Sequence, residues 1–307
     1  MNTLAAGVSF LDLKFQGTPQ FIAVAVLHGP GGVALIDPGP SITLPTLEQE
    51  LGRAGISMND VTALLLTHIH LDHAGATGTL IGENPRLRVY VHEKGATHLI
   101  DPGKLLASAT RLFGDRMDRL YGEFRPVPPE AIVTLRGGER IEAAGRALQV
   151  AYTPGHASHH VSYFSEEVGI AFVGDTAGIK RPPDGYVLPP TPPPDIDLDS
   201  WRASLARVEA WRPETLFLTH FGPHAPSGPH LTELRDHLEV ASRLVEASLA
   251  REESDEAREA WFIDRVRREL RRHLSDAEAQ AYEVVGRFDL NWRGLARSLR
   301  KKANLRL

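Results

Sequence analysis

The sequence predicts an α/β fold followed by a region built only of helices. Short runs with β-type patterning recur through the first 220 residues, and amphipathic helical patterns lie between some of them. From about Pro229 only helical patterns remain. With 307 residues, the chain can bury a large core or two modest ones. We therefore predict an α/β domain over residues 1–228 and a helical domain over residues 229–307.

The expected strands are short and have glycine-containing connections early in the chain, so much of the sheet should be antiparallel. They cover Val8–Phe15, Phe21–Leu27, Val33–Ile36, Leu64–Thr67, Arg88–Val91, Ala147–Thr153, Val161–Phe164, Ile170–Val173 and Leu216–Thr219. Three helices are expected between them because apolar residues recur three or four positions apart, at Thr46–Ala54, Ala74–Gly82 and Leu198–Trp211. Asp199 or Ser200 is the expected N-cap of the third.

Two segments interrupt this pattern. Lys94–Pro129 is predicted to be a helical insertion, because its leucines and aromatic residues fall at helical spacing. Thr176–Asp199 is predicted to be a long loop, and it holds seven of the 22 prolines. Long loops inside compact domains tend to be functional, and proline stiffens this one.

The C-terminal region should contain four helices, over His230–Arg251, Ser254–His273, Ser275–Val285 and Asn291–Ala303. Ser254 and Ser275 are suitable N-caps, and Ser275 forms a capping-box pattern with Glu278.

Composition restricts the chemistry before any motif is considered. The chain has no cysteine, which excludes disulfides, thiol nucleophiles and every metal site with a thiolate ligand. A metal must therefore bind to His, Asp or Glu, and there are 14 histidines. No apolar run approaches the roughly 20 residues of a membrane span, and no signal-peptide pattern opens the sequence, so we expect a cytoplasmic protein without a membrane partner.

Charge is unevenly distributed along the chain. The formal net charge is −5, yet Gly286–Leu307 carries seven basic residues and one acidic residue. A basic tail can attract nucleic acid or anionic ligands, although a solvated helix face is the more common explanation.

Potential metal ligands follow four of the expected strands. They are His68, His70, Asp72 and His73 after the first, His156 after the second, Asp175 after the third and His220 after the fourth. Strand ends can share one rim of a sheet. Extended backbone would project His68 and His70 to the same side, and a turn would bring Asp72 and His73 to a neighbouring position. Imidazoles and carboxylates suit zinc, iron or manganese, and seven ligands suit two metal ions.

The run Thr67-His68-Ile69-His70-Leu71-Asp72-His73-Ala74-Gly75 resembles the signature of the metallo-β-lactamase-fold hydrolases. Its companions match in order: Ile36-Asp37-Pro38-Gly39, Thr153-Pro154-Gly155-His156, Gly174-Asp175 and Thr219-His220. The resemblance covers about residues 8–224 and implies an αβ/βα sandwich with a dinuclear site on one edge.

The resemblance also implies a role for each residue. His68, His70 and His156 look like ligands of one metal, and Asp72, His73 and His220 like ligands of the other, with Asp175 as the bridging carboxylate. Asp37 resembles the acid that supports such a site without binding metal. Pro154-Gly155-His156-Ala157-Ser158-His159-His160 resembles the lactonase arrangement, and we expect a supporting role for His160 and a side chain of His159 that points away from the site.

Hydrolysis by a metal-bridging hydroxide follows from this resemblance, because one zinc ion can lower the pKa of water from 15.7 to about 7. Asp72 could transfer the proton, with Asp175 as the other carboxylate of the reaction. Two divalent cations are expected, with zinc preferred and iron or manganese as alternatives. The substrate would be a small-molecule ester, thioester or lactone, as in the glyoxalase II and lactonase branches.

Other functions remain open. An iron-dependent persulfide dioxygenase is one alternative, and a nuclease is another, although the negative net charge disfavours nucleic acid. The insertion and the proline loop should line the substrate pocket, with Tyr121, Phe124, Tyr186 and Leu188 as contacts; packing against the sheet is the competing interpretation. The helical domain could bind an anionic substrate through its basic tail, form a homodimer, or only cover the core.

Overall fold

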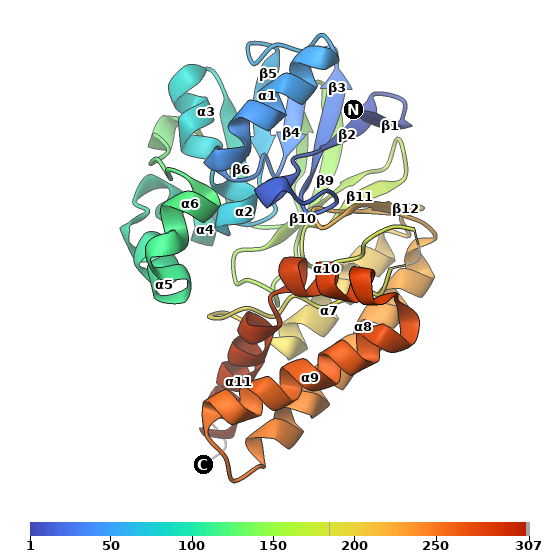
Figure 1. Cartoon of the computed structure of the whole chain (residues 1–307). Helices are drawn as coiled ribbons and strands as arrows, with labels where there is room; N and C mark the ends of the chain where they lie inside the picture. Colours follow the sequence, from blue (N-terminus) through green and yellow to red (C-terminus); the bar gives the residue numbers. More distant parts are fainter. Residues whose placement is uncertain (184, 305–307) are drawn as a thin grey trace.

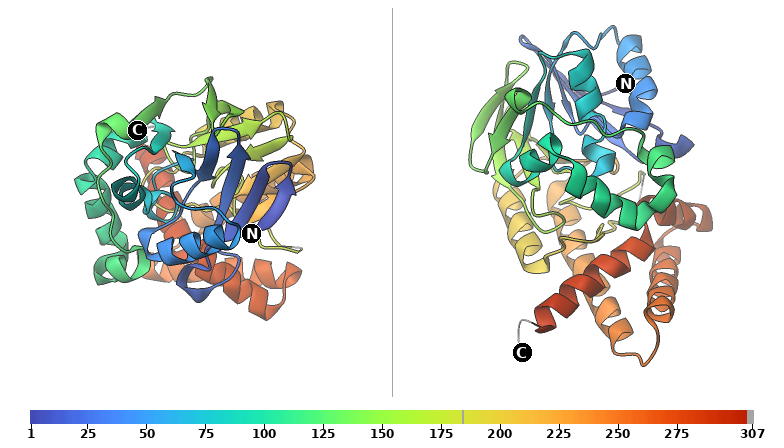
Figure 2. Two further views of the ribbon diagram at one scale, coloured as in Figure 1. Left: turned by 90° about the horizontal axis from the view of Figure 1, so that it is seen from above. Right: turned by 90° about the vertical axis from the view of Figure 1, so that its left-hand side faces the viewer.

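A computed structural model gives the fold of residues 1–183 and 185–304, and it is a four-layered αβ/βα sandwich with a C-terminal group of helices (Figure 1). One sheet has the order β1-β2-β3-β4-β5-β6-β7, and the other has the order β13-β12-β11-β10-β9-β8. The predicted fold class is confirmed. Figure 2 shows the C-terminal helices packed below the sandwich in a second orientation.

The first sheet is antiparallel in its first half and parallel in its second half. Strands β1 to β4 pair antiparallel, and β4 to β7 pair parallel. The strands are β1 (Asn2–Ala5), β2 (Val8–Asp12), β3 (Ala23–Gly29), β4 (Gly32–Ile36), β5 (Val61–Leu65), β6 (Arg88–His92) and β7 (Ile132–Leu135). The second sheet is antiparallel except between β11 and β12. Its strands are β8 (Arg140–Ala143), β9 (Arg146–Tyr152), β10 (Val161–Ser165), β11 (Ile170–Phe172), β12 (Thr215–Leu218) and β13 (Gly222–His224).

Side chains along each strand point alternately to the two faces of its sheet, and the apolar ones form three buried layers. One face of each sheet contributes to the layer between the sheets, where Ala25 and Leu65 pack with Tyr163 and Phe172. The opposite face of the first sheet packs on α1 (Leu44–Arg53), α2 (Leu71–Ala74) and α3 (Thr77–Glu83). The opposite face of the second sheet packs on α7 (Leu198–Ala210).

The insertion after β6 forms three helices, α4 (Glu93–Ile100), α5 (Gly103–Phe113) and α6 (Met117–Tyr121), as its periodicity predicts. The C-terminal region forms α8 (Ser227–Leu249), α9 (Asp255–His273), α10 (Asp276–Gly286) and α11 (Phe288–Asn304). Ser254 and Ser275 accept hydrogen bonds from backbone N–H groups three residues ahead, so both predicted caps are confirmed.

The helices α8, α9 and α11 share a hydrophobic core with α7 and the second sheet, in which Trp201 and Trp292 are buried. They therefore extend the outer layer of the sandwich. The division at residue 228 stays a prediction.

Several local predictions were wrong. The strand expected over Val8–Phe15 ends at Asp12, because Lys14 and Gln16 adopt left-handed backbone conformations in a turn. The helix expected over Ala74–Gly82 is divided into α2 and α3. Helix α7 is capped by Asp197, whose Oδ1 accepts a hydrogen bond from Ser200 N at 3.0 Å, and not by Asp199 or Ser200.

Four short strands were missed: β1, β7, β8 and β13. Among the described residues, no helix is both long and apolar enough to cross a bilayer.

Candidate metal centre

Four loops meet at one edge of the sandwich and bring the seven predicted ligands together. The loop after β5 carries His68, His70, Asp72 and His73, and the loops after β9, β11 and β12 carry His156, Asp175 and His220. His70 has an extended backbone conformation immediately before α2. This short helix then places Asp72 and His73 beside His70. Both sheets therefore contribute to one site.

The donor atoms form two groups that Asp175 joins. In the first group, His70 Nδ1 lies 2.9 Å from His68 Nε2 and 3.0 Å from His156 Nε2. In the second, Asp72 Oδ2 lies 3.4 Å from His220 Nε2 and 3.9 Å from His73 Nε2.

Asp175 places one oxygen against each group. Its Oδ2 is 3.3 Å from His156 Nε2, and its Oδ1 is 3.3 Å from His73 Nε2 and 3.6 Å from His220 Nε2. A carboxylate in this position could bind cations in both groups. Each group contains enough closely spaced donors to hold one metal ion.

Two of the buried donor atoms have no hydrogen-bond partner among the described residues, as expected of atoms that bind a metal. They are His73 Nε2 and Asp175 Oδ1. Such atoms carry a desolvation cost that a bound cation would offset. The ring nitrogens of His68, His70 and His156 also converge, so a cation there would have three donors.

Burial holds most of the imidazoles neutral, which is the form that binds metal. Burial lowers the pKa of His68 well below its usual value, lowers that of His70 to about 4, and lowers that of His156 despite the nearby Asp175 carboxylate. Burial opposes the charge of His73 too, but Asp175, Asp37 and Asp72 outweigh it and raise the pKa of His73.

The two carboxylates stay ionised. Burial would raise their pKa values, but His73, His156 and His220 lower the pKa of Asp175, and His73 and His220 lower that of Asp72. The protein therefore offers two negative charges together with the neutral rings of His68, His70 and His156, and this donor set favours divalent cations.

A hydrogen-bonded layer behind the donors fixes their orientation. Asp37, which has a positive φ of 51°, is fully buried, and its Oδ2 accepts hydrogen bonds from Thr67 Oγ1 at 2.7 Å, Thr219 Oγ1 at 2.7 Å and His73 Nδ1 at 2.9 Å. Because Nδ1 of His73 carries the proton in this contact, its Nε2 is free to face the centre.

Main-chain carbonyls orient two further rings. His156 Nδ1 donates to Pro190 O at 2.9 Å, and His220 Nδ1 donates to Phe21 O at 2.7 Å. Both contacts leave Nε2 facing the donor groups. The proline loop thus orients His156, a predicted ligand.

His160 is placed behind the site as expected. Its Nδ1 lies 3.0 Å from Thr153 Oγ1 and 3.1 Å from Thr176 Oγ1, and its Nε2 accepts a 3.3 Å hydrogen bond from Asp175 N. His159 differs from the expectation, because it borders the cavity described below instead of pointing away from it.

Comparison with known proteins identifies the fold family. The family model of the metallo-β-lactamase superfamily matches residues 17–220, about two thirds of the chain. The chain belongs to this superfamily.

Several metallo-β-lactamase-fold relatives resemble the chain over different lengths. A metallo-β-lactamase fold-containing protein from Sulfurisphaera tokodaii is 27% identical over 72% of this chain and 82% of its own. A hydroxyacylglutathione hydrolase from a Synechococcus strain is 30% identical over 50% of this chain and 48% of its own. The chain thus matches only about half of that hydrolase.

Solved structures of the superfamily cover nearly the whole chain. A metallo-β-lactamase family protein from Thermus thermophilus has a TM-score of 0.73, 26% identity, and coverage of 98% of this chain and 95% of its own. A superfamily protein from Sulfolobus tokodaii has a TM-score of 0.64 at 23% identity, covering 94% of this chain and 98% of its own. The C-terminal helices therefore have counterparts in other members.

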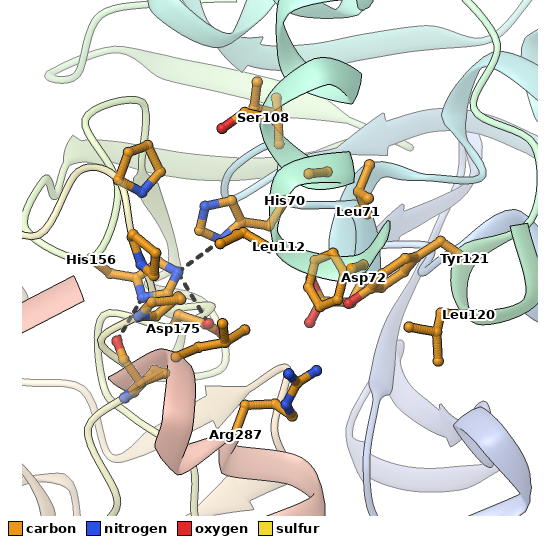
Figure 3. A pocket seen from close by; sticks show the side chains of 18 of the residues that line it. His70, Leu71, Asp72, Ser108, Leu112, Leu120, Tyr121, His156, Asp175 and Arg287 are labelled. Carbon is orange, nitrogen blue, oxygen red and sulfur yellow. Dashed lines mark hydrogen bonds and ion pairs between the residues drawn. The ribbon is translucent and has the colours of Figure 1, made fainter. Parts of the chain in front are cut away.

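A cavity of about 700 Å³ opens over the metal centre (Figure 3). Its ligand wall contains His70, Asp72, His156, Asp175 and His220. An apolar wall faces it and comes from α5, α6 and the α10–α11 junction: Leu105, Ala109, Leu112, Phe113, Leu120, Tyr121, Val284, Val285 and Leu290. Arg287, from the same junction, also lines the cavity, and its guanidinium is paired with Asp289.

The pocket predictions had mixed outcomes. Tyr121 lines the cavity, but Phe124, Tyr186 and Leu188 do not, so these three contacts were wrong. Phe124 packs against the core of the first sheet. Tyr186 is buried, with its ring stacked on His237 of α8 at a centroid distance of 3.9 Å, and Leu188 is buried beside it. The C-terminal helices thus cover the part of the proline loop that the sequence assigned to the substrate.

Other cavity residues were missed by sequence reasoning. Arg287, Val284 and Leu290 come from a helix junction in which no chemical motif stands out. The available signal was Gly286 at the end of a helical pattern, which marks a break between helices. Within the predicted basic tail, Arg287 lines this cavity, but Arg297, Arg300, Lys301 and Lys302 do not.

Proposed function

We propose that this superfamily hydrolase cleaves a small-molecule ester, thioester or lactone at a dinuclear metal centre. The observation that carries the proposal is the pair of donor groups joined by Asp175 and exposed to a cavity with an apolar wall. Apolar side chains suit an acyl chain, because they gain from contact with it and leave no polar group unpaired.

We assign one metal to His68, His70 and His156 and the other to Asp72, His73 and His220, with Asp175 shared. Two divalent cations, zinc in preference to iron or manganese for this donor set, would supply Lewis acidity toward the acyl oxygen and acidify a water molecule. The roles of these seven residues are part of the proposal.

Asp72 is suited to move the proton of the attacking water. Its side chain is 26% exposed, against 6% for Asp175, so it is the more accessible carboxylate at the centre. Its Oδ2 faces His220 and His73, which leaves Oδ1 available to accept a proton. Burial and the Asp72 charge raise the pKa of Tyr121, so this neighbouring phenol stays protonated and can donate a hydrogen bond to substrate.

The hydroxyacylglutathione hydrolases among the relatives support the thioester branch of the proposal. Their names describe reactions in which water adds to an acyl carbon and a thiol leaves with the proton. Nothing in the described cavity favours a persulfide or a polynucleotide over an acyl substrate, so those alternatives enter as outcomes of the test.

The test is metal analysis of the purified protein, combined with thioester, lactone, phosphodiester and persulfide substrates. We expect about two divalent metal ions per chain and turnover of an acyl substrate that stops after chelation and returns with added metal. Turnover confined to a phosphodiester, or oxygen uptake with a persulfide, would overturn the proposal.

A further inference from the structure

A second concavity, of about 1200 Å³, lies beside the metal cavity. It is formed by α7, α8, α11 and the chain before α7, together with residues from α4 and the end of β9. We call it the basic groove, after its eight cationic side chains: Lys94, Arg202, Arg207, Arg243, Arg297, Arg300, Lys301 and Lys302.

Many of these cations are not neutralised by neighbouring carboxylates. Among the described residues, no ion pair involves Lys94, Arg207, Arg243, Arg297 or Lys301, and all five are exposed. Three others are already paired: Arg202 with Asp199 and Glu239, Arg300 with Asp255, and Lys302 with Asp199. Exposed, uncompensated guanidinium and ammonium groups around one concavity attract anions.

The groove is continuous with the metal cavity. Lys94, Ser158, Pro194 and Asp195 line both concavities. Ser158 Oγ donates a 2.6 Å hydrogen bond to Asp195 Oδ2, and Lys94 Nζ donates a 2.8 Å hydrogen bond to Tyr152 OH, so both sides of this junction are held in place. A ligand long enough to pass the junction would contact both regions.

We infer that the basic groove binds a phosphate-bearing arm of the substrate while the acyl end lies in the metal cavity. The inference rests on the proposed function and narrows it to esters or thioesters with a large polyanionic leaving group. Phosphate oxygens match the uncompensated cations, because guanidinium groups bind them through paired hydrogen bonds.

Acidic residues in the groove favour a small polyanion over a nucleic acid. Asp195, Asp197 and Glu246 line the groove and form no ion pair among the described residues. A polynucleotide laid along the groove would bring phosphates against these carboxylates. A short arm with two or three phosphates could contact the arginines and avoid them.

The first arm of the test uses two thioesters of the same acyl group. One is the coenzyme A thioester, and the other is the N-acetylcysteamine thioester, which lacks the phosphates. We expect Arg243→Gln/Arg297→Gln/Lys301→Gln to lower kcat/KM for the first at least about tenfold, mainly through KM, and to leave the second unchanged. The control Arg86→Gln/Arg268→Gln/Arg271→Gln removes three exposed cations that lie outside both concavities, and it should change neither.

The second arm measures ADP binding, which does not depend on hydrolysis. We expect the wild-type protein to bind ADP with an affinity that falls as salt rises, and the groove variant to bind it at least about tenfold more weakly. Equal ADP affinity of the wild type and the groove variant would overturn the inference that the basic groove binds phosphates, whatever the enzyme hydrolyses.

Other outcomes separate the two proposals. Turnover of both thioesters without preference for the phosphate-bearing one would overturn the role of the basic groove in substrate binding and leave the hydrolase proposal unaffected. Charge-dependent ADP binding without turnover of any acyl substrate would overturn the hydrolase proposal and, with it, the assignment of the groove to a substrate arm. A single-stranded oligonucleotide that binds more tightly than ADP through the same three side chains would overturn the small-molecule assignment.

Discussion

The two walls of the metal cavity are built in different ways. On the ligand wall, the side chains of His156, Asp175 and His220 are at most 6% exposed, come from strand ends and are held by hydrogen bonds behind them. On the apolar wall, Leu112, Phe113 and Leu120 are half-buried on short helices, and Val284 is 44% exposed. Buried side chains held by hydrogen bonds suit a reaction centre, and partly exposed apolar side chains suit the selection of a substrate.

Removing a donor from the ligand wall should have the largest effect. His68→Ala or Asp175→Ala should lower kcat/KM by about 10³-fold or more, which corresponds to about 4 kcal/mol of transition-state stabilisation. The bound metal, measured by mass spectrometry, should fall as well, while the circular dichroism spectrum stays that of the wild type. Full activity in either variant would contradict the dinuclear mechanism.

A change behind the ligand wall should have the next largest effect. Asp37→Asn replaces a carboxylate oxygen that accepts three side-chain hydrogen bonds, so His73 and the two threonines lose part of their support. We expect metal affinity to fall about 10- to 100-fold in a chelator competition assay. Asp60→Asn changes an exposed carboxylate away from the cavity and serves as the control. Equal metal affinity of Asp37→Asn and wild type would show that the support is dispensable.

A change on the apolar wall should alter selectivity and leave metal binding intact. Leu112→Ala removes apolar contacts from the cavity, and we expect about a tenfold loss of kcat/KM for medium-chain acyl substrates and a smaller loss for acetyl substrates. Leu106→Ala is a matched control on the same helix, half-buried but outside the cavity. A uniform loss across chain lengths, or lost metal, would remove the distinction between the walls.

The last prediction concerns stability and no change in activity. It involves His230 of α8, which lies outside both walls. Its Nε2 donates to Ala177 O at 2.8 Å, and burial lowers its pKa to about 4. Because the folded pKa lies below the ordinary value of 6.5, the unfolded chain binds the proton first as pH falls. The stabilisation from neutral His230 is complete above pH 6.5 and decreases toward pH 4.

Urea unfolding at pH 7 and pH 4.5 checks this expectation. The wild type should lose about 2 kcal/mol more stability over this interval than His230→Gln, because one pKa unit corresponds to about 1.4 kcal/mol. Both proteins share all other titrating groups, so the difference isolates His230. Identical losses would show that this histidine does not titrate differently in the folded state.

Sequence reasoning named the donor side chains that the structure brings together, and it largely failed on the apolar wall. His68, His70, Asp72 and His73 lie in one short run, and the other predicted ligands follow β9, β11 and β12, which run in the same direction and end at the same edge of the sandwich. Local order along the chain thus determines their proximity.

The apolar wall depends on packing between distant helices. Tyr186 looked like a pocket residue, but stacking on His237, 51 positions later in the chain, buries it elsewhere. Arg287 reaches the cavity because it adopts a left-handed conformation, with φ of 44°, between α10 and α11. Neither the partner of Tyr186 nor the direction of Arg287 has a periodic or motif signal.

Asp37 joins parts of the chain that are synthesised at different times. Its carboxylate is hydrogen-bonded to Thr67 and His73 of the first sheet's loop and to Thr219, which is adjacent to the last ligand, His220. At about 5–20 residues per second, translation from His68 to His220 takes roughly 10–30 seconds. Until then the early histidines lack His156, Asp175 and His220, so the complete donor set can form only late in the synthesis of the chain.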